Sequence, residues 1–197
     1  MKRITMFDYG AGNLHSLAKA LAPAGNVRVT TDIRAALDTD LLVLPGVGAF
    51  SQAAYRIGSA RDTVRSAIAA GLPTIGICLG MQLLFDESEE GSGAGIGAIP
   101  GRVTKLRAKR IPQIGWNDVE WTESNYHSLS NAYFANTYVC EPDDRACVRA
   151  WSTHENERFA SVVGIANTVG VQFHPEKSSH AGVSFLRDLA TELMECK

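Results

Sequence analysis

The chain alternates short apolar runs with glycine-rich turns, and this alternation constrains its fold more than any other feature of the sequence. Apolar runs at residues 3–7, 40–44 and 72–77 each lead into such a turn. The run at residues 40–44 is apolar almost throughout, as expected of a parallel strand covered on both faces. Segments with helical spacing of apolar residues connect the runs, which predicts an α/β fold with a doubly wound, mostly parallel sheet flanked by helices. In such a sheet, the turns after the strands lie at the carboxyl edge, where functional sites form.

The helices of the first half are expected at residues 14–21, with Asn13 as N-cap, and at residues 33–37 and 53–70. In the second half short strands predominate, so we expect antiparallel strands that extend the sheet or form a small second one. They are predicted at residues 101–106, 115–121, 133–140, 145–151, 159–165 and 169–173. A final amphipathic helix is expected from Ser179 onward.

The composition is that of an ordinary globular protein. With 197 residues, 45% of them hydrophobic and 20% charged, the chain is expected to form one domain over residues 1–197. The net charge of −2 gives no electrostatic reason to expect nucleic acid or a membrane as a partner. We recognise no secretory leader, and no apolar run approaches the roughly 20 residues of a membrane span.

The four cysteines show no spacing typical of a zinc site or a disulfide framework. They are Cys78, Cys140, Cys147 and Cys196. No cluster of metal ligands is visible, and no metal is expected. A reduced, cytoplasmic protein is the simplest interpretation, because a free thiol is then available for chemistry.

Cys78 stands between an apolar strand and a helix, within Gly-Ile-Cys-Leu-Gly-Met-Gln at residues 76–82. Residues 79–85 read as the first turns of the helix, and the small Gly76 and Gly80 allow a tight turn around the cysteine. The unpaired N–H groups and the positive dipole end of a helix N-terminus favour a thiolate over a thiol. The position predicts a nucleophile, whereas a buried structural cysteine is the alternative if this motif is considered alone.

A motif near the C-terminus supplies the base that a thiol nucleophile needs. Residues 169–173 read as a buried strand that leads into His174-Pro175-Glu176. Pro175 favours an extended conformation at His174, and in an extended segment Glu176 projects to the same side as the imidazole. A base oriented by an acid is the arrangement of a Cys-His-Glu triad. The agreement between the two motifs favours the nucleophile over the structural cysteine.

A glycine-rich turn is the third candidate element of the site. The strand at residues 40–44 ends in a Pro-Gly-Val-Gly turn that contains Gly46, Val47 and Gly48. Its glycines allow backbone N–H groups to point into a shared site, as an oxyanion hole requires. The N–H group of Leu79, the residue after the nucleophile, would be a second donor. An ordinary turn is the alternative interpretation for this loop alone.

These motifs together resemble those of the class I, or triad, glutamine amidotransferases. The resemblance rests on Pro-Gly-Val-Gly-Ala-Phe at residues 45–50, the Cys78 motif and Phe-His-Pro-Glu-Lys-Ser at residues 173–178. Within that family, residues 8–14, 99–101 and 115–117 are similar to the glutaminase subunits of imidazole glycerol phosphate synthases in histidine biosynthesis. The motifs occur in order and at the ends of predicted strands.

The resemblance implies a glutaminase that converts glutamine to glutamate and ammonia through a γ-glutamyl thioester on Cys78. It implies that Gln82, Thr137 and Tyr138 contact the α-amino acid end of glutamine. Two positions depart from the family, which usually has His at Asn136 and often at Gln113, and their detailed roles are therefore open.

The resemblance also implies a separate partner chain, because the glutaminase fold takes up the whole sequence. That partner would be a (β/α)8 barrel cyclase, which receives ammonia through an internal tunnel and makes imidazole glycerol phosphate and AICAR in a heterodimer. No cofactor is expected, since the triad itself supplies the nucleophile.

Other classes of protein remain as alternatives. Two other kinds of enzyme would share the elbow, that is, the tight turn that carries Cys78. They are a glutaminase subunit of another amidotransferase and a cysteine peptidase or related hydrolase of similar fold. Gln82 beside the elbow and the acid directly after His-Pro disfavour the hydrolase. A catalytically inactive scaffold subunit is disfavoured because Cys78, His174 and Glu176 are all present.

Overall fold

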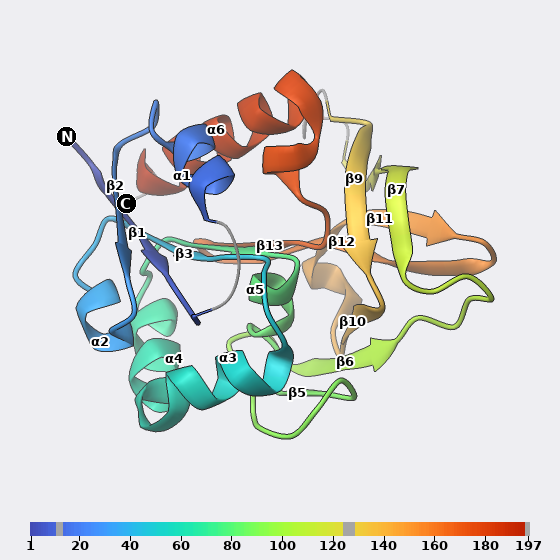
Figure 1. Ribbon diagram of the computed structural model, residues 1–197, viewed down its shortest axis with the longest axis horizontal. Helices are drawn as coiled ribbons and strands as arrows, with labels where there is room; N and C mark the ends of the chain where they lie inside the picture. Colours follow the sequence, from blue (N-terminus) through green and yellow to red (C-terminus); the bar gives the residue numbers. More distant parts are fainter. Residues whose placement is uncertain (11–13, 124–128, 196–197) are drawn as a thin grey trace.

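The computed structural model describes residues 1–10, 14–123 and 129–195 of the chain. A large mixed sheet lies at the centre of the molecule, with helices on both faces and a small two-stranded sheet at one end (Figure 1). The predicted N-cap Asn13 lies outside the described residues. Over the described ranges, no helix is long and apolar enough to cross a membrane.

The first half of the chain builds a parallel sheet, as predicted, and β13 from the second half, which was predicted among the antiparallel strands, joins it in parallel with β4. The strand order is β2-β1-β3-β4-β13, and each of these neighbours is paired in parallel. The strands are β1 (Arg3–Phe7), β2 (Asn26–Thr30), β3 (Leu41–Leu44), β4 (Thr74–Ile77) and β13 (Thr168–Val171). Every residue of β3, β4 and β13 is buried, which explains why their sequences are apolar without alternation.

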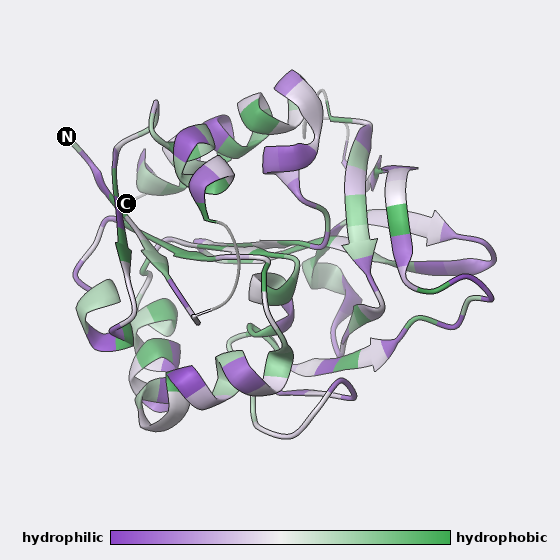
Figure 2. Cartoon of the chain, in the orientation of Figure 1, coloured by the Kyte–Doolittle hydropathy of each residue, from purple (hydrophilic) through white to green (hydrophobic). Residues whose placement is uncertain are grey.

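Helices cover both faces of this sheet. In Figure 1, α1 (His15–Leu21) and α6 (Ser179–Glu195) lie on one face. The opposite face carries α2 (Ile33–Ala36), α3 (Phe50–Ile57), α4 (Arg61–Ala69) and α5 (Leu79–Gln82). The buried apolar residues form two clusters, one on each side of the sheet. In Figure 2 the central strands are mostly coloured as hydrophobic, and the helices carry hydrophilic stripes.

The second half of the chain both extends the sheet and adds a small one. Antiparallel pairing begins at β13 and continues through β12, β10 and β6. These strands and their neighbours are β5 (Glu87–Ser88), β6 (Gly101–Lys105), β8 (Glu120–Trp121), β10 (Tyr138–Pro142), β11 (Val148–His154) and β12 (Glu157–Ile165). The separate antiparallel pair consists of β7 (Gln113–Asp118) and β9 (Asn131–Asn136).

The prediction of one helix over residues 53–70 is wrong. Two helices, α3 and α4, are separated by the short 3-10 helix η1 (Gly58–Ala60), because Gly58 has a φ of 46° that an α-helix cannot contain. The helix predicted at residues 79–85 also stops early, at Gln82. The carbonyl groups after it accept hydrogen bonds from residues 96–99 and not from a continuing helix.

The predicted strands at residues 133–140 and 145–151 also differ from the structure. The first is divided at Thr137 into β9 and β10, which belong to different sheets. In the second, the 3-10 helix η2 (Arg145–Cys147) precedes a strand that begins at Val148. Aromatic and β-branched residues lie on both sides of Thr137, so tertiary pairing sets the boundary between β9 and β10.

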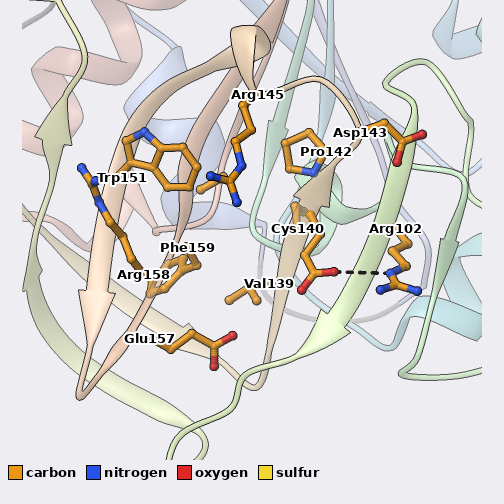
Figure 3. A pocket seen from close by; sticks show the side chains of 12 residues that line it. Arg102, Val139, Cys140, Pro142, Asp143, Arg145, Trp151, Glu157, Arg158 and Phe159 are labelled. Atoms are coloured by element: carbon orange, nitrogen blue, oxygen red, sulfur yellow. Dashed lines mark hydrogen bonds and ion pairs between the residues drawn. The ribbon is translucent and has the colours of Figure 1, made fainter.

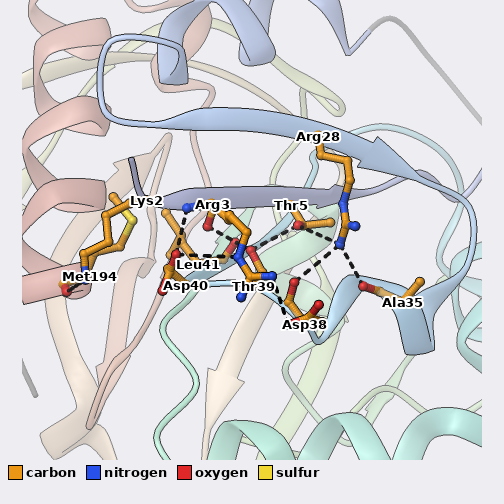
Figure 4. Close-up of polar contacts among 10 residues, drawn as sticks. All are labelled: Lys2, Arg3, Thr5, Arg28, Ala35, Asp38, Thr39, Asp40, Leu41 and Met194. Carbon is orange, nitrogen blue, oxygen red and sulfur yellow. Dashed lines mark hydrogen bonds and ion pairs between the residues drawn. The ribbon is translucent and has the colours of Figure 1, made fainter.

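Polar contacts close the amino-terminal edge of the parallel sheet (Figure 4). Arg3 Nη1 lies 3.0 Å from Asp38 Oδ1, and Arg28 Nη2 donates to the carbonyl of Ala35 at 2.9 Å. Lys2 Nζ donates to the carbonyl of Met194 near the end of α6 at 3.0 Å. These contacts hold α2, the loop after it and α6 at the edge opposite to the predicted site, which lies at the carboxyl ends of the strands.

Candidate active site

Cys78 follows β4 directly and has a strained backbone, with φ 46° and ψ −105°. Two glycines make this turn possible, because a Cβ atom on Gly76 would lie 2.6 Å from the carbonyl oxygen of Gly80. A Cβ atom on Gly80 would lie only 1.9 Å from the carbonyl oxygen of Leu44 in β3. A non-glycine residue held at positive φ costs on the order of 1–3 kcal/mol, so the surrounding packing must maintain this elbow.

His174 and Glu176 are in direct contact. His174 Nδ1 lies 2.8 Å from Glu176 Oε1, and the two side chains are only 4% and 8% exposed. His174 is extended, with φ −101° and ψ 93°, as Pro175 predicts. Glu176, however, lies on the 3-10 helix η3 (Pro175–Lys177), so the chain turns at once and does not stay extended. The predicted contact is therefore present, although its backbone geometry differs from the prediction.

The backbone of His174 is fixed to strand β9. Its N–H group donates to the carbonyl of Tyr133 at 2.8 Å. Its carbonyl accepts a hydrogen bond of 2.6 Å from Ser178 Oγ, and that hydroxyl accepts one of 2.9 Å from the N–H group of Tyr133. These contacts fix the backbone from which the imidazole projects.

The surroundings of His174 favour its charged form. Burial alone lowers the pKa of a histidine, but contacts with Cys78 and Glu176 outweigh it and raise the pKa of His174 from 6.5 to about 9. An imidazole that carries a proton next to a thiol matches an ion pair with a thiolate, which is the reactive form of cysteine. Because Glu176 engages Nδ1, Nε2 is the nitrogen left to face the sulfur.

The glycine turn after β3 lies against this pair. A Cβ atom on Gly46 would lie 2.9 Å from His174 Cε1 and 3.0 Å from Cys78 Cβ, so only glycine fits there. Gly48 has a φ of 108°, a backbone conformation that residues other than glycine rarely adopt. The N–H group of Leu79 belongs to the first turn of α5, where it has no acceptor within the helix.

A pocket of about 180 Å³ opens beside Cys78 and unites most of the predicted site residues. It is lined by Gly46, Gly48, Cys78, Leu79, Gln82, Glu90, Ala135, Asn136, Thr137 and Tyr138. Val47 belongs to the same turn but is not among these lining residues. The pocket thus joins the carboxyl ends of β3 and β4 to the junction between β9 and β10.

Sequence reasoning missed two polar residues of this region. Glu90 lines the pocket, accepts a hydrogen bond of 3.3 Å from the N–H group of Phe50, and has a pKa raised by burial. The run Glu-Ser-Glu-Glu-Gly around it reads as an exposed loop, so no local signal marks it. Gln172 is fully buried next to Cys78, inside a segment that reads only as a strand.

The two positions that depart from the family face each other. Gln113 and Asn136 are register partners in β7 and β9, and each is 4% exposed. Asn136 Nδ2 donates to the carbonyl of Tyr138 at 3.1 Å. Within the described residues, Gln113 Oε1 and Asn136 Oδ1 have no hydrogen-bond partner.

A larger cavity of about 500 Å³ has none of the three triad residues in its wall (Figure 3). Its wall contains Trp151, with the guanidinium groups of Arg145 and Arg158 at 5.9 and 5.2 Å from the ring centroid. Arg102 pairs with Glu141 at 3.3 Å in the same wall. In the part of the chain that the structure describes, no group of three or more His, Cys, Asp or Glu side chains is placed to hold a metal ion.

Comparisons with known proteins agree with the geometry. A family model described as glutamine amidotransferase class-I matches residues 5–193. Imidazole glycerol phosphate synthase subunit HisH from Gloeothece citriformis is 39% identical, over 98% of this chain and 97% of that protein. The HisH subunit from Thermus thermophilus is 42% identical, over 92% and 93%. Among solved structures, PurLQS from Thermotoga maritima is similar in fold, with a TM-score of 0.74 and 17% identity over 98% of this chain and 97% of that one.

Proposed function

Because the chain belongs to the class I glutamine amidotransferases, we propose that it is a glutaminase subunit that hydrolyses glutamine to glutamate and ammonia. One observation carries the proposal. Cys78 stands on a strained elbow at φ 46°, and beside it His174 lies 2.8 Å from the carboxylate of Glu176. Nucleophile, base and orienting acid are the three parts of a catalytic triad. The whole chain is proposed to act as one domain.

In the reactive form, the proton of the Cys78 thiol has passed to Nε2 of His174, so that a thiolate lies beside an imidazolium. The thiolate sulfur attacks the side-chain carbonyl carbon of glutamine, and the carbonyl oxygen becomes an oxyanion. N–H groups from the Gly46–Gly48 turn and from Leu79 would stabilise that oxyanion. His174 then gives its proton to the departing nitrogen, which leaves as ammonia, and a γ-glutamyl thioester remains on the sulfur. Water, deprotonated by His174, attacks the thioester, releases glutamate and restores the thiol.

The pocket beside Cys78 offers groups for the other end of glutamine. Gln82, Thr137 and Tyr138 line it, as the family resemblance implied, and would contact the α-amino acid group. We assign Glu90 to the α-ammonium, because a partly buried carboxylate in the pocket wall gains a charge partner when that group binds. The Glu90 carboxylate would then distinguish glutamine from amides without an α-amino group.

The partner is proposed to be a cyclase subunit with a (β/α)8 barrel, which uses the ammonia to make imidazole glycerol phosphate and AICAR. The names of the relatives, subunits of imidazole glycerol phosphate synthase, support this assignment. Strand β7 exposes Ile114 and Trp116, which are 67% and 55% accessible, although both are large and apolar. It pairs with β9, whose residues Ala135 and Asn136 line the pocket, so a partner docked there would lie close to the released ammonia. A reduced cytoplasmic setting, which keeps the Cys78 thiol free, is part of the proposal.

The test uses Cys78→Ser in the complex with the cyclase. We expect that glutamine no longer supports the cyclase reaction, whereas added ammonium salt supports it as in the wild-type complex. Cys140→Ser serves as the control, because Cys140 is a buried thiol outside the elbow. Full loss of glutamine-dependent activity in folded Cys140→Ser would show that Cys78 is not the nucleophile, and peptide cleavage without ammonia release would assign the chain to the cysteine hydrolases.

A further inference from the structure

Gln172 is a buried amide that the triad does not explain. It follows the last residue of β13, two positions before His174, and its side chain is fully buried. Its N–H group donates to the carbonyl of Ser161 at 2.8 Å, which fixes the backbone and directs the side chain towards the elbow. Because a buried amide is costly unless it is hydrogen-bonded, the partners of this side chain are informative.

The amide of Gln172 connects the nucleophile to the glutamine pocket. Gln172 Nε2 lies 3.5 Å from Cys78 Sγ, within hydrogen-bond distance for sulfur. Gln172 Oε1 lies 3.4 Å from Gln82 Nε2. Gln82 Nε2 in turn lies 3.2 Å from the carbonyl oxygen of Tyr138, in the pocket wall. Four groups therefore form one continuous line from the wall of the pocket to the sulfur.

The direction of every hydrogen bond in this line follows from its first member. The carbonyl oxygen of Tyr138 can only accept, so the NH₂ group of Gln82 must face it. The same NH₂ group donates to Gln172, which must therefore present its oxygen to Gln82. The NH₂ group of Gln172 is left facing the sulfur as a donor. A backbone carbonyl thus sets the orientation of an amide that could otherwise be turned either way.

A donor at this place suits a thiolate. Cys78 is only 7% exposed, so water contributes little to stabilising a charge on its sulfur. The helix after it, α5 (Leu79–Gln82), is a single turn, and the helix dipole expected to favour the thiolate is correspondingly small. Hydrogen bonds to an anion are stronger than those to a neutral group, so the amide favours the thiolate over the thiol.

We propose that Gln172 is a further catalytic residue, which donates a hydrogen bond from Nε2 to the Cys78 thiolate and is held in that orientation by Gln82. The sulfur is then stabilised by Gln172 as well as by the imidazolium of His174. Since Gln82 lines the pocket, a substrate that orders Gln82 also orders the donor at the sulfur. The inference rests on the proposed role of Cys78 as nucleophile.

The test measures how fast iodoacetamide alkylates Cys78 between pH 5 and pH 10, with the Cys78 peptide quantified by mass spectrometry. The substitution Gln172→Met preserves the size of the side chain and removes the donor. A hydrogen bond to a charged group is worth more than one to a neutral group, so its loss should move this profile to higher pH. Alkylation near pH 7 should become about 10-fold slower, and at pH 10 the rates of variant and wild type should converge. Recovery at high pH separates the loss of a donor from damage to the fold, which higher pH does not repair.

The control is Thr104→Val, which replaces a polar side chain by an apolar one at a position that is also buried. Among the described residues, the Thr104 hydroxyl has no hydrogen-bond partner, so its removal breaks no hydrogen bond among them. Its alkylation profile should match that of the wild type. If Gln172→Met does not fold, Gln172→Asn retains the amide but is one methylene too short to reach from Gln82 to the sulfur, and it should shift the profile in the same direction. An unshifted profile in a folded Gln172 variant would overturn the proposal. That result would leave glutamine hydrolysis by the wild-type complex intact, whereas failure of the proposed function would appear as wild-type enzyme that releases no glutamate.

Discussion

At the scale of single residues, the site depends on a charge kept inside the protein. His174 is 3% exposed, and burial at this level usually removes the proton of a histidine. Here the neighbouring sulfur of Cys78 and the carboxylate of Glu176 reverse that tendency and raise the pKa of His174 to about 9. The same contacts that would prepare Cys78 as the proposed nucleophile therefore also contribute to the stability of the fold.

This linkage predicts that the free energy of unfolding decreases from neutral to alkaline pH. The pKa of His174 is about 9 in the folded chain and near 6.5 in the unfolded chain. The folded state therefore binds more protons between these values, and stability falls as pH rises. The contribution of His174, roughly 3 kcal/mol, is complete below pH 6.5 and lost above about pH 9. Urea unfolding at pH 6 and pH 9.5 measures it, and an equally steep loss in His174→Asn would contradict the assignment.

Glu176→Gln should lower the rate of glutamine hydrolysis and leave the fold unchanged. The amide keeps the size of the side chain but removes the charge that we propose to orient and stabilise the imidazolium. In serine protease triads the loss of the orienting acid costs up to ~10⁴-fold in rate. Glutamate release by the complex measures the effect, with the exposed Glu192→Gln as the control. An unchanged rate would mean that another acid orients His174.

How much of the site the sequence predicts depends on how local the signal is. Cys78, His174 and the Gly46 turn are adjacent to strand ends, so their placement follows from short motifs. Gln172 also follows a strand end, but neither Gln172 nor Glu90 belongs to a motif that marks its role, because both roles arise from contacts between distant segments. The hydrogen bond from Gln172 to Cys78, for example, joins residues 94 positions apart.

At the scale of secondary structure elements, the elbow is formed by three closely packed segments. Strands β3 and β4 and the single turn of α5 approach so closely that their contacts are backbone to backbone at Gly76, Gly80 and Leu44. Because there is no side chain to move aside, the geometry of the elbow is set by the main chain. This rigidity is what holds Cys78 at positive φ.

Gly80→Ala is therefore expected to destabilise the protein severely. The added methyl group would lie 1.9 Å from the carbonyl oxygen of Leu44, and only displacement of the backbone could relieve the overlap. We expect a loss of about 3 kcal/mol or more, at the upper end of overpacking effects. Gly91→Ala is the matched control, because its methyl group would first meet the Ser51 side chain at 3.2 Å. Equal urea midpoints for the two variants would contradict the close packing.

The central parallel strands β3 and β4 were predictable because burial on both faces leaves a mostly apolar run in the sequence. The breaks within other elements were not. Gly58 alone does not distinguish a helix that ends from one that continues past a glycine. The division between β9 and β10 at Thr137 depends on which strands lie beside them, and no local property of these residues specifies it.

At the scale of the whole molecule, the site lies where the parallel and antiparallel parts of the sheet meet. Strand β13 pairs in parallel with β4 and antiparallel with β12, and the small β7–β9 sheet lies at the same end of the molecule (Figure 1). Exposed Trp116 on β7 packs edge-on against Tyr133 of β9, with ring centroids 6.3 Å apart. Since Tyr133 also holds His174, the apolar face and the triad share one strand.

Trp116→Ala should weaken binding of the cyclase partner by about 30-fold, the effect of losing an aromatic hot spot of about 2 kcal/mol. Its melting temperature and Cys78 alkylation should stay at wild-type values, because the side chain is 55% exposed. Tyr55→Ala is the control, since Tyr55 is an aromatic residue that is 83% exposed on α3, in the helical layer below the sheet in Figure 1. Calorimetric titration with the partner compares them, and equal affinities would place the docking face elsewhere.

The pairing of β4 with β13 also sets the order in which the chain becomes reactive during its synthesis. Cys78 is translated 94 residues before Gln172, and the antiparallel strands are made in the interval. Pairing between strands so distant in the chain is a slow step of folding. Until it occurs, the nascent thiol would lack both the proposed base, His174, and the proposed donor, Gln172. A growing chain on the ribosome thus stays inert towards glutamine until the last strand of its sheet is inserted.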